Sequence, residues 1–226
     1  MKKSLSLLLI FASLNVSAQM VEKKAMNIPG FASKQDRLIL NFNWDNWLDA
    51  SSGVEVNGFR SRGFGFLLMN EKVLGQGNIA IGFGLGFSSQ NVHSNTFPTY
   101  NDDKSMTYLT PIIGDYDLNK LSVNFIDAAL EFRFRTNENE SLKRFKFTAG
   151  MKGGLLVQSH TKHDNDTFGK VKTYRIKNLN SFQYGLTARI GYGRLGASGY
   201  YSLVNLFKTD KGPGVVPVSI GLAYAL

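Results

Sequence analysis

The chain has 226 residues, which is enough for one domain with a sizeable interior. Its 23 glycines, 5 prolines and 12% aromatic residues favour many short strands over long helices, and the absence of cysteine excludes disulfide bonds and thiolate metal sites. The formal net charge of +9 is spread along the chain instead of forming one basic patch.

The N-terminus has the features of a secretory signal. Two lysines precede the apolar run 5–14, which is too short to span a bilayer, and small residues lead up to Ala18. We therefore predict a signal peptide over 1–18 and a short periplasmic segment over 19–36, the alternative being an uncleaved anchor. No later run approaches the length of a membrane-spanning helix, which excludes a helical inner-membrane protein. An exported chain does not meet nucleic acid, so we expect no nucleic-acid partner.

Residues 37–226 contain eight runs in which large apolar residues alternate with small or polar ones. Alternation with a period of two is typical of β-strands. Eight such runs predict an all-β fold, an eight-stranded antiparallel transmembrane β-barrel with apolar residues facing lipid and small ones facing a narrow lumen. The runs cover residues 37–47, 59–70, 78–89, 121–136, 145–158, 181–193, 195–207 and 215–226.

The third run shows this alternation most clearly. Large apolar residues occupy its odd positions from Ile79 to Phe87, and the even positions hold Gly82, Gly84 and Gly86. We expect these glycines to face the lumen, bare because side chains from across the barrel pack onto them. A soluble β-sandwich is the alternative, but its outer faces would carry more polar side chains than these runs offer.

In the fourth run, the apolar residues change from odd to even positions near Phe125 and Ile126. A single extra residue reverses the side-chain alternation of a strand, so this change predicts a β-bulge at that point.

The connections between runs alternate between short and long. Outer-membrane barrels have short periplasmic turns and longer external loops, so the pattern predicts that both termini are periplasmic. Aromatic residues then form two girdles at the lipid–water boundaries. We expect Trp44 and Trp47, with Phe207, at the outer interface, and Tyr192 and Tyr224 at the periplasmic one.

Charged residues interrupt the lumen faces of the runs. Opposite charges buried together must pair, because an unpaired ion in a low dielectric is very costly. We predict a salt-bridged plug inside the barrel, since eight strands leave room only for side chains. A selective pore is the alternative. The predicted interior charge network comprises Asp45, Asp127, Glu131, Arg133, Lys152 and Arg189.

Three histidines in predicted loops are the candidates for catalysis. His160 and His163 are three residues apart, Ser159 precedes them and acidic residues follow, so a metal site or an acid–base pair is conceivable. His93 is the third. A solvated loop is the simpler interpretation, so we expect no enzymatic activity, no cofactor and no metal. A small barrel that modifies lipid A remains the alternative.

The predicted loop 165–180 is basic. Such a loop could hold lipopolysaccharide phosphates or a partner protein, or it could simply be well solvated. The expected partners are outer-membrane lipid, lipopolysaccharide and other outer-membrane proteins of a secretion or assembly complex. The basic residues are Lys170, Lys172, Arg175 and Lys177.

Several stretches after residue 35 carry a family resemblance. They are Asp36-Arg37-Leu38, Asn46-Trp47-Leu48-Asp49, Arg62-Gly63-Phe64-Gly65-Phe66, Ala129-Leu130-Glu131-Phe132-Arg133-Phe134, Leu206-Phe207-Lys208-Thr209-Asp210-Lys211-Gly212-Pro213-Gly214-Val215 and Pro217-Val218-Ser219-Ile220-Gly221-Leu222. With them, most of the chain after residue 35 resembles the PorT-like outer-membrane β-barrel family of Bacteroidota. The resemblance implies an integral outer-membrane barrel of about eight strands in a Gram-negative bacterium, with no agreed catalytic motif, and a namesake needed for type IX protein secretion. It therefore implies a structural or accessory role, in contrast to a lipid A-modifying enzyme or a narrow channel.

Overall fold

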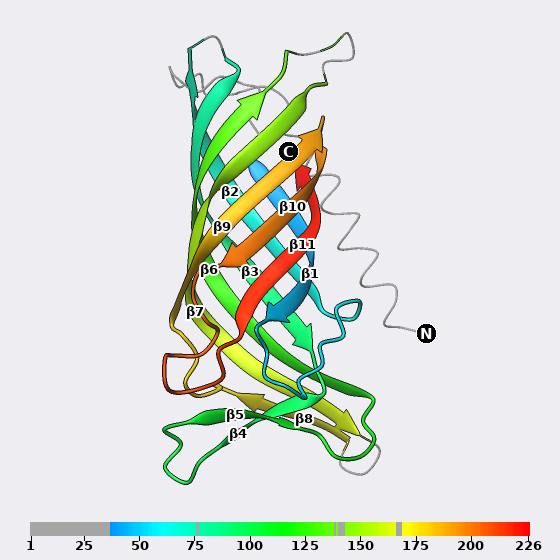
Figure 1. Cartoon of the computed structure of the whole chain (residues 1–226). Coiled ribbons are helices and arrows are strands. Elements are labelled where there is room, and N and C mark those ends of the chain that lie inside the picture. The colour runs from blue at the N-terminus through cyan, green and yellow to red at the C-terminus, as the bar shows by residue number, and fades with distance from the viewer. Residues whose placement is uncertain (1–36, 76, 138, 140–142, 166–168) are drawn as a thin grey trace, which may run out of the picture. The chain divides into compact units, whose positions relative to one another are not determined.

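The computed structural model describes residues 37–226 apart from 76, 138, 140–142 and 166–168. The predicted signal peptide, 1–18, and the whole predicted segment 19–36 lie outside the described residues. Within them, eight antiparallel strands form a closed ring in which each strand pairs with the next and the last pairs with the first (Figure 1). The ring order is β1 (Leu38–Leu48), β2 (Arg62–Leu74), β3 (Ile79–His93), β6 (Leu118–Arg135), β7 (Phe145–Asn165), β9 (Phe182–Tyr192), β10 (Leu195–Ser202) and β11 (Val216–Ala225).

The ring confirms the predicted eight-stranded antiparallel barrel. Alternation places the large apolar residues on its outside, where Leu85 is 65% exposed, and the small residues inside, where Ala80 is fully buried. Exposed apolar side chains recur on the outer face of every barrel strand. Such a continuous apolar belt is suited to lipid, because soluble monomers rarely expose apolar patches of this size. In the described part of the chain, no helix is long and apolar enough to cross a bilayer.

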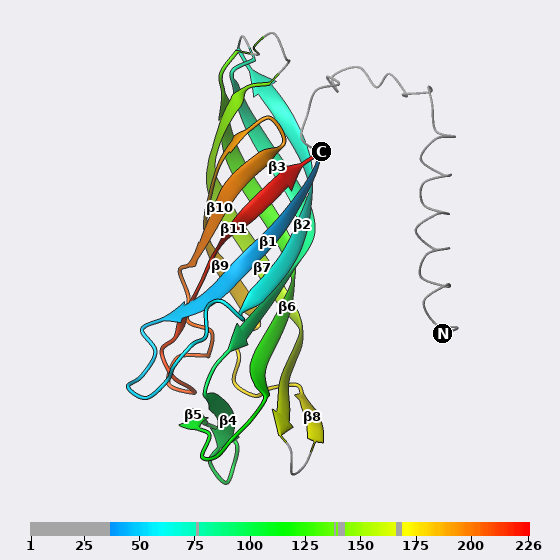
Figure 2. The same cartoon turned by 90° about the vertical axis from the view of Figure 1, so that its right-hand side faces the viewer.

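The two ends of the barrel differ. At one end, here the turn end, β2–β3, β6–β7 and β9–β10 are joined by the short connections that the sequence predicts, and β11 ends there (Figure 2). At the other, the loop end, the connections contain three strands that we had expected to be loops. They are β4 (Thr96–Tyr100) and β5 (Thr107–Pro111), which form a hairpin, and β8 (Gly169–Tyr174), which pairs with β7.

Three ring strands extend further toward the loop end than predicted. β3 continues to His93, β6 begins already at Leu118, and β7 runs on to Asn165. Their outward side chains change from apolar to polar along these extensions, for example from Phe87 to Asn91 on β3. The sheet therefore continues beyond the apolar belt and carries a polar outer face there.

The predicted bulge lies on a different strand. Odd residues of β6 face inward throughout, so Phe125 is buried while Ile126 is 54% exposed. The extra residue is Val157 on β7, because Asn124 pairs with Gln158 whereas Phe125 pairs with Leu156. The prediction on β6 was wrong because the residues lining the lumen change from apolar to charged at this level, which alters the pattern without altering the side-chain direction.

The glycines of β3 face the interior as predicted, but the side chains that cover them come from adjacent strands and not from across the barrel. The Arg133 guanidinium of β6 lies over Gly82, where a Cβ would be 2.9 Å from Nε. Met69 and Leu67 of β2 lie over Gly84 and Gly86 in the same way.

Candidate functional site

The lumen near the turn end is filled by an ion cluster centred on Arg133. Its Nη1 lies 2.8 Å from Glu71 Oε2 and its Nη2 lies 2.8 Å from Glu131 Oε2. Arg189 Nη2 reaches the same Glu131 oxygen at 3.0 Å, and Arg135 pairs with Glu71. Arg133, Glu71 and Glu131 are almost completely buried. Each carboxylate thus contacts two guanidinium groups, which offsets the cost of removing these charges from water.

Sequence reasoning placed Glu131, Arg133 and Arg189 in this network but missed two of its members. Glu71 follows the predicted end of the second run by one residue, and it is buried because β2 continues to Leu74. Arg135 lies on the inward face of β6, in step with Arg133. Extending the alternation of the second run by one residue would have found Glu71, whereas Arg135 already lay on the inward face of the predicted run 121–136.

A second polar group fills the middle of the lumen. Lys152 Nζ lies 3.0 Å from Asp127 Oδ2, donates to Ser88 Oγ at 3.2 Å and sits 4.6 Å from the centre of the Tyr200 ring. This arrangement combines an ion pair with a cation–π contact. Asp127 and Lys152, both predicted interior charges, therefore lie together.

Asp45, the sixth predicted interior charge, is bound by neutral donors. Ser219 Oγ donates to Oδ1 at 2.7 Å, and the backbone N–H of Asn91 donates to Oδ2 at 2.8 Å. Gly63 is on β2, between β1 and β3. Because it has no side chain, the Asp45 carboxylate of β1 can pass over it to reach Asn91 on β3. Among the described residues, no lysine or arginine lies within ion-pair distance of Asp45, so it is anchored in the barrel wall and not in the charge network.

Toward the loop end, an apolar cluster replaces the charges inside the barrel. The β4–β5 hairpin and the segment after β8 lie over this mouth, joined by a hydrogen bond from Asn178 Nδ2 to Thr107 Oγ1 at 2.9 Å. Below the cluster, a cavity of about 60 Å³ remains beside Lys152 and Tyr200, which is room for a few waters only. The buried members of the cluster are Trp47, Val92, Leu121, Val123, Phe125, Ile176, Leu179, Leu206, Phe207 and Val215.

This cluster corrects the prediction for two aromatic residues. Trp47 is 6% exposed and Phe207 is 1% exposed, so neither belongs to a lipid-facing girdle. Trp47 points inward because it lies three residues after the outward Trp44, and residues three apart on a strand face opposite sides. Tyr192 faces outward against the Phe145 ring at 4.9 Å, and Tyr224 is half-buried on the outer side of β11.

The histidines do not assemble a site. His160 lies on the outer face of β7 beside Tyr174, whereas His163 points inward toward Phe97 and Tyr116. His160 and His163 therefore lie on opposite faces of β7, because residues three apart share a face on a helix but not on a strand. Ser159 also faces inward, where its Oγ accepts a hydrogen bond from the backbone N–H of residue 176. Within the residues described, no group of three His, Asp or Glu side chains could hold a metal ion.

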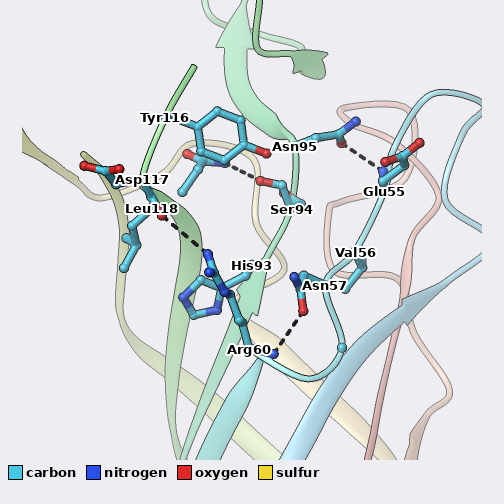
Figure 3. Close-up of a pocket in the computed structure, with 12 residues that line it drawn as sticks. Glu55, Val56, Asn57, Arg60, His93, Ser94, Asn95, Tyr116, Asp117 and Leu118 are labelled. Carbon is cyan, nitrogen blue, oxygen red and sulfur yellow. Dashed lines mark hydrogen bonds between the residues drawn. The ribbon is translucent and has the colours of Figure 1, made fainter. Parts of the chain in front are cut away.

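His93 lines a polar pocket of about 470 Å³ on the outside of the loop end (Figure 3). Arg60 crosses this pocket and donates to the backbone carbonyl of Asp117 at 3.5 Å. Asn119 also lines the pocket and donates to the backbone carbonyl of Ser94 at 2.8 Å. Burial, followed by the charges of nearby basic residues, lowers the pKa of His93 below its usual range. In the part of the chain that the structure describes, no hydroxyl or carboxylate is hydrogen-bonded to this ring.

The predicted basic loop is divided between a strand and a turn. Lys170 and Lys172 lie on one face of β8, and Lys170 pairs loosely with Asp164 at 3.7 Å. Arg175 adopts a left-handed backbone conformation just after β8, with φ of 57°. Lys177 follows, and its backbone N–H donates to Tyr100 Oη at 3.3 Å. These four residues therefore do not form one flexible basic loop.

Comparison with known proteins agrees with this architecture. No curated protein matched the chain. The model of the family described as "Outer membrane protein beta-barrel domain" matches residues 25–208, which is most of the chain. A closed ring of eight strands, an outward apolar belt and this match lead to one conclusion: the chain belongs to the outer membrane protein β-barrel domain family and is an integral protein of the Gram-negative outer membrane.

Proposed function

We propose that this barrel is a structural or accessory component of a complex for protein secretion or envelope assembly, with no enzymatic activity of its own. The filled lumen carries this proposal, because a barrel blocked by ion pairs and an apolar cluster has no room for transport or for a buried substrate. The resemblance to the PorT-like family supports type IX secretion as the pathway. The proposed partners are outer-membrane lipid, lipopolysaccharide and other outer-membrane proteins.

In the proposed topology, the turn end and both termini face the periplasm, and the loop end faces the exterior. Short connections at the turn end support this orientation, since outer-membrane barrels keep short turns on the periplasmic side. The ordered hairpin β4–β5 and the strand β8 then form an external platform for protein contacts.

Co-purification tests the accessory role. An epitope inserted after Asp102, at the exposed tip of the β4–β5 hairpin, should recover the barrel with a reproducible set of envelope proteins from detergent-solubilised outer membranes. The same tag on an unrelated small barrel is the control, and proteins are identified by mass spectrometry. Recovery of the tagged barrel alone, after mild crosslinking as well as without it, would refute a role in a complex.

The absence of catalysis gives a second prediction. Alanine at His93, His160 and His163 together should leave the lipid A mass spectrum identical to that of wild-type cells. His163 points into the barrel, whereas His93 and His160 lie on the outer face of β3 and β7, with β6 between them. A strain without the protein should show the same spectrum. A change in acyl-chain or phosphate content in either strain would mean that the barrel acts on lipid A.

The filled lumen gives a third prediction. Purified protein in planar bilayers should give no steady open-channel currents, because the 60 Å³ cavity is blocked by an apolar cluster toward the loop end. A large porin added to the same bilayer provides the positive control. Steady currents that scale with the amount of folded protein would show that the lumen conducts.

A further inference from the structure

A row of basic residues crosses four neighbouring strands on the outer face of the loop end. His93 of β3 is directly opposite Lys120 of β6, which is opposite Lys162 of β7, which is opposite Lys172 of β8. Directly opposite residues point to the same side of a sheet. Val92 and Leu121, the neighbours of the first two, are buried inside the barrel, so the row, which we call the cationic row, faces outward.

The row is not neutralised by the protein. Among described residues, no carboxylate lies within 4.0 Å of Lys120, Lys162 or Lys172. Like charges directly opposite on neighbouring strands destabilise a sheet. Burial, followed by the charges of Lys162 and Lys172, lowers the pKa of Lys120, as expected where positive charges gather without a counter-ion. A fold that keeps such an arrangement is well prepared to bind an anion.

The side chain at the centre of the row is held in place. Lys120 Nζ donates to Asn91 Oδ1 at 2.9 Å, and Ser122 Oγ donates to the same oxygen at 2.8 Å. One of the three ammonium protons is used in this bond, which leaves the others for a ligand. Arg60 and Arg62 lie beyond His93 and add their charges to that end of the row.

The height of the row identifies the type of anion. On β6, Ile126 is the last exposed apolar residue before the polar extension, and Lys120 lies six positions further toward the loop end. At about 3.3 Å per residue and a tilt of about 40°, this places the backbone of Lys120 about 15 Å beyond the apolar belt. Lysine side chains extend back toward the interface. The row therefore lies level with phosphorylated sugars, above the acyl chains of the lipid.

We propose that the cationic row binds the phosphate groups of lipid A in the outer leaflet. The proposal rests on the topology given above and deepens it by naming the surface that contacts lipopolysaccharide. Lys120, Lys162 and Lys172 supply the charge. The His93 end opens into the polar pocket of Figure 3, whose amide groups and two carboxylates, Glu55 and Asp117, suit the hydroxyl groups of a sugar adjoining the phosphate.

Binding of bisphosphorylated lipid A to the full-length folded protein in detergent micelles, followed by native mass spectrometry, tests the proposal. Glutamine at Lys120, Lys162 and Lys172 together should weaken binding at least about tenfold, in line with the loss of several charge-assisted contacts. The matched control carries glutamine at Lys104, Lys208 and Lys211, which are exposed lysines elsewhere at the loop end and give the same change in net charge. It should bind within twofold of wild type. Heat-dependent migration on SDS gels verifies that both variants are folded.

Further experiments identify the source of the phosphate and, separately, test the orientation of the barrel in the membrane. Wild-type protein should bind dephosphorylated lipid A weakly, and millimolar inorganic phosphate should not displace the lipid. Equal losses in both triple variants, equal binding of dephosphorylated lipid A or displacement by inorganic phosphate would each overturn the proposal. Because the chain has no cysteine, Lys208→Cys with an impermeant maleimide on intact cells reports the topology separately. Absent labelling would contradict the orientation and hence an outer-leaflet ligand, whereas labelling without selective binding would contradict the cationic row alone.

Discussion

Methionine in place of Arg133 should lower the free energy of unfolding by about 3–5 kcal/mol, the range observed when one partner of a buried ion pair is removed. Arg133 bridges Glu71 and Glu131, and its loss leaves each of these buried carboxylates with one neutralising partner fewer. Urea titration in lipid vesicles, read out by tryptophan fluorescence, measures the change.

Two variants make this prediction specific. Lys72→Met removes a cation from the exposed outer face of β2, directly after Glu71, and should change stability by less than about 0.5 kcal/mol. Arg133→Lys keeps the charge but loses the planar fork that contacts two carboxylates, so its stability should lie between wild type and methionine. Equal stability of Arg133→Met and Lys72→Met would mean that the ion cluster contributes nothing to the folded barrel.

Leucine in place of Gly84 should abolish the folded form that migrates anomalously on unheated SDS gels. A Cβ at this position would collide with the backbone carbonyl of Leu68 and with Sδ of Met69 on the adjacent strand. The backbone cannot yield without breaking the β2–β3 pairing, so the cost exceeds the usual penalty of about 1–3 kcal/mol for overpacking. Even alanine should lower the yield of folded barrel.

Gly199 provides the matched control within a barrel strand. A Cβ there meets nothing closer than the Ser219 carbonyl oxygen at 3.9 Å. Gly199→Leu should therefore fold and insert as wild type does. If Gly84→Leu gave the same folded yield as Gly199→Leu, then the close approach of β2 to β3 at this glycine would not be required for assembly.

The sequence was sufficient to predict the barrel because lipid outside and a narrow lumen inside impose strict alternation on every ring strand. Gly82 and its apolar neighbours could not exchange faces without placing bulk in the lumen. The same alternation also predicted which charged residues of β6 face the lumen, including Glu131 and Arg133. The same rule also places Trp47 inside the barrel, because it is three residues after the outward-facing Trp44. The prediction of a position at the lipid interface relied on residue type alone.

The remaining features depend on contacts that alternation does not encode. Strands β4, β5 and β8 have no lipid-facing side, so their short polar sequences look like loops. The inward apolar residues of β6, such as Phe125, belong to the apolar cluster formed with the loops that fold over the mouth. They do not mark a change of direction in the strand. The cationic row required knowledge of register, because His93, Lys120, Lys162 and Lys172 are far apart in the sequence and adjacent only across four paired strands.

The pairing of β1 with β11 has a consequence for biogenesis. Ten consecutive residue pairs, from Ile39 with Ala225 to Leu48 with Val216, join the two ends of the strand sequence. Until β11 reaches β1, both strands expose unpaired backbone groups that hydrocarbon cannot satisfy. We therefore expect membrane entry and ring closure to be concerted, because β1 stays unpaired on one side until β11 arrives. Such sequence-remote closure is intrinsically slow, which favours catalysis by an insertion machine.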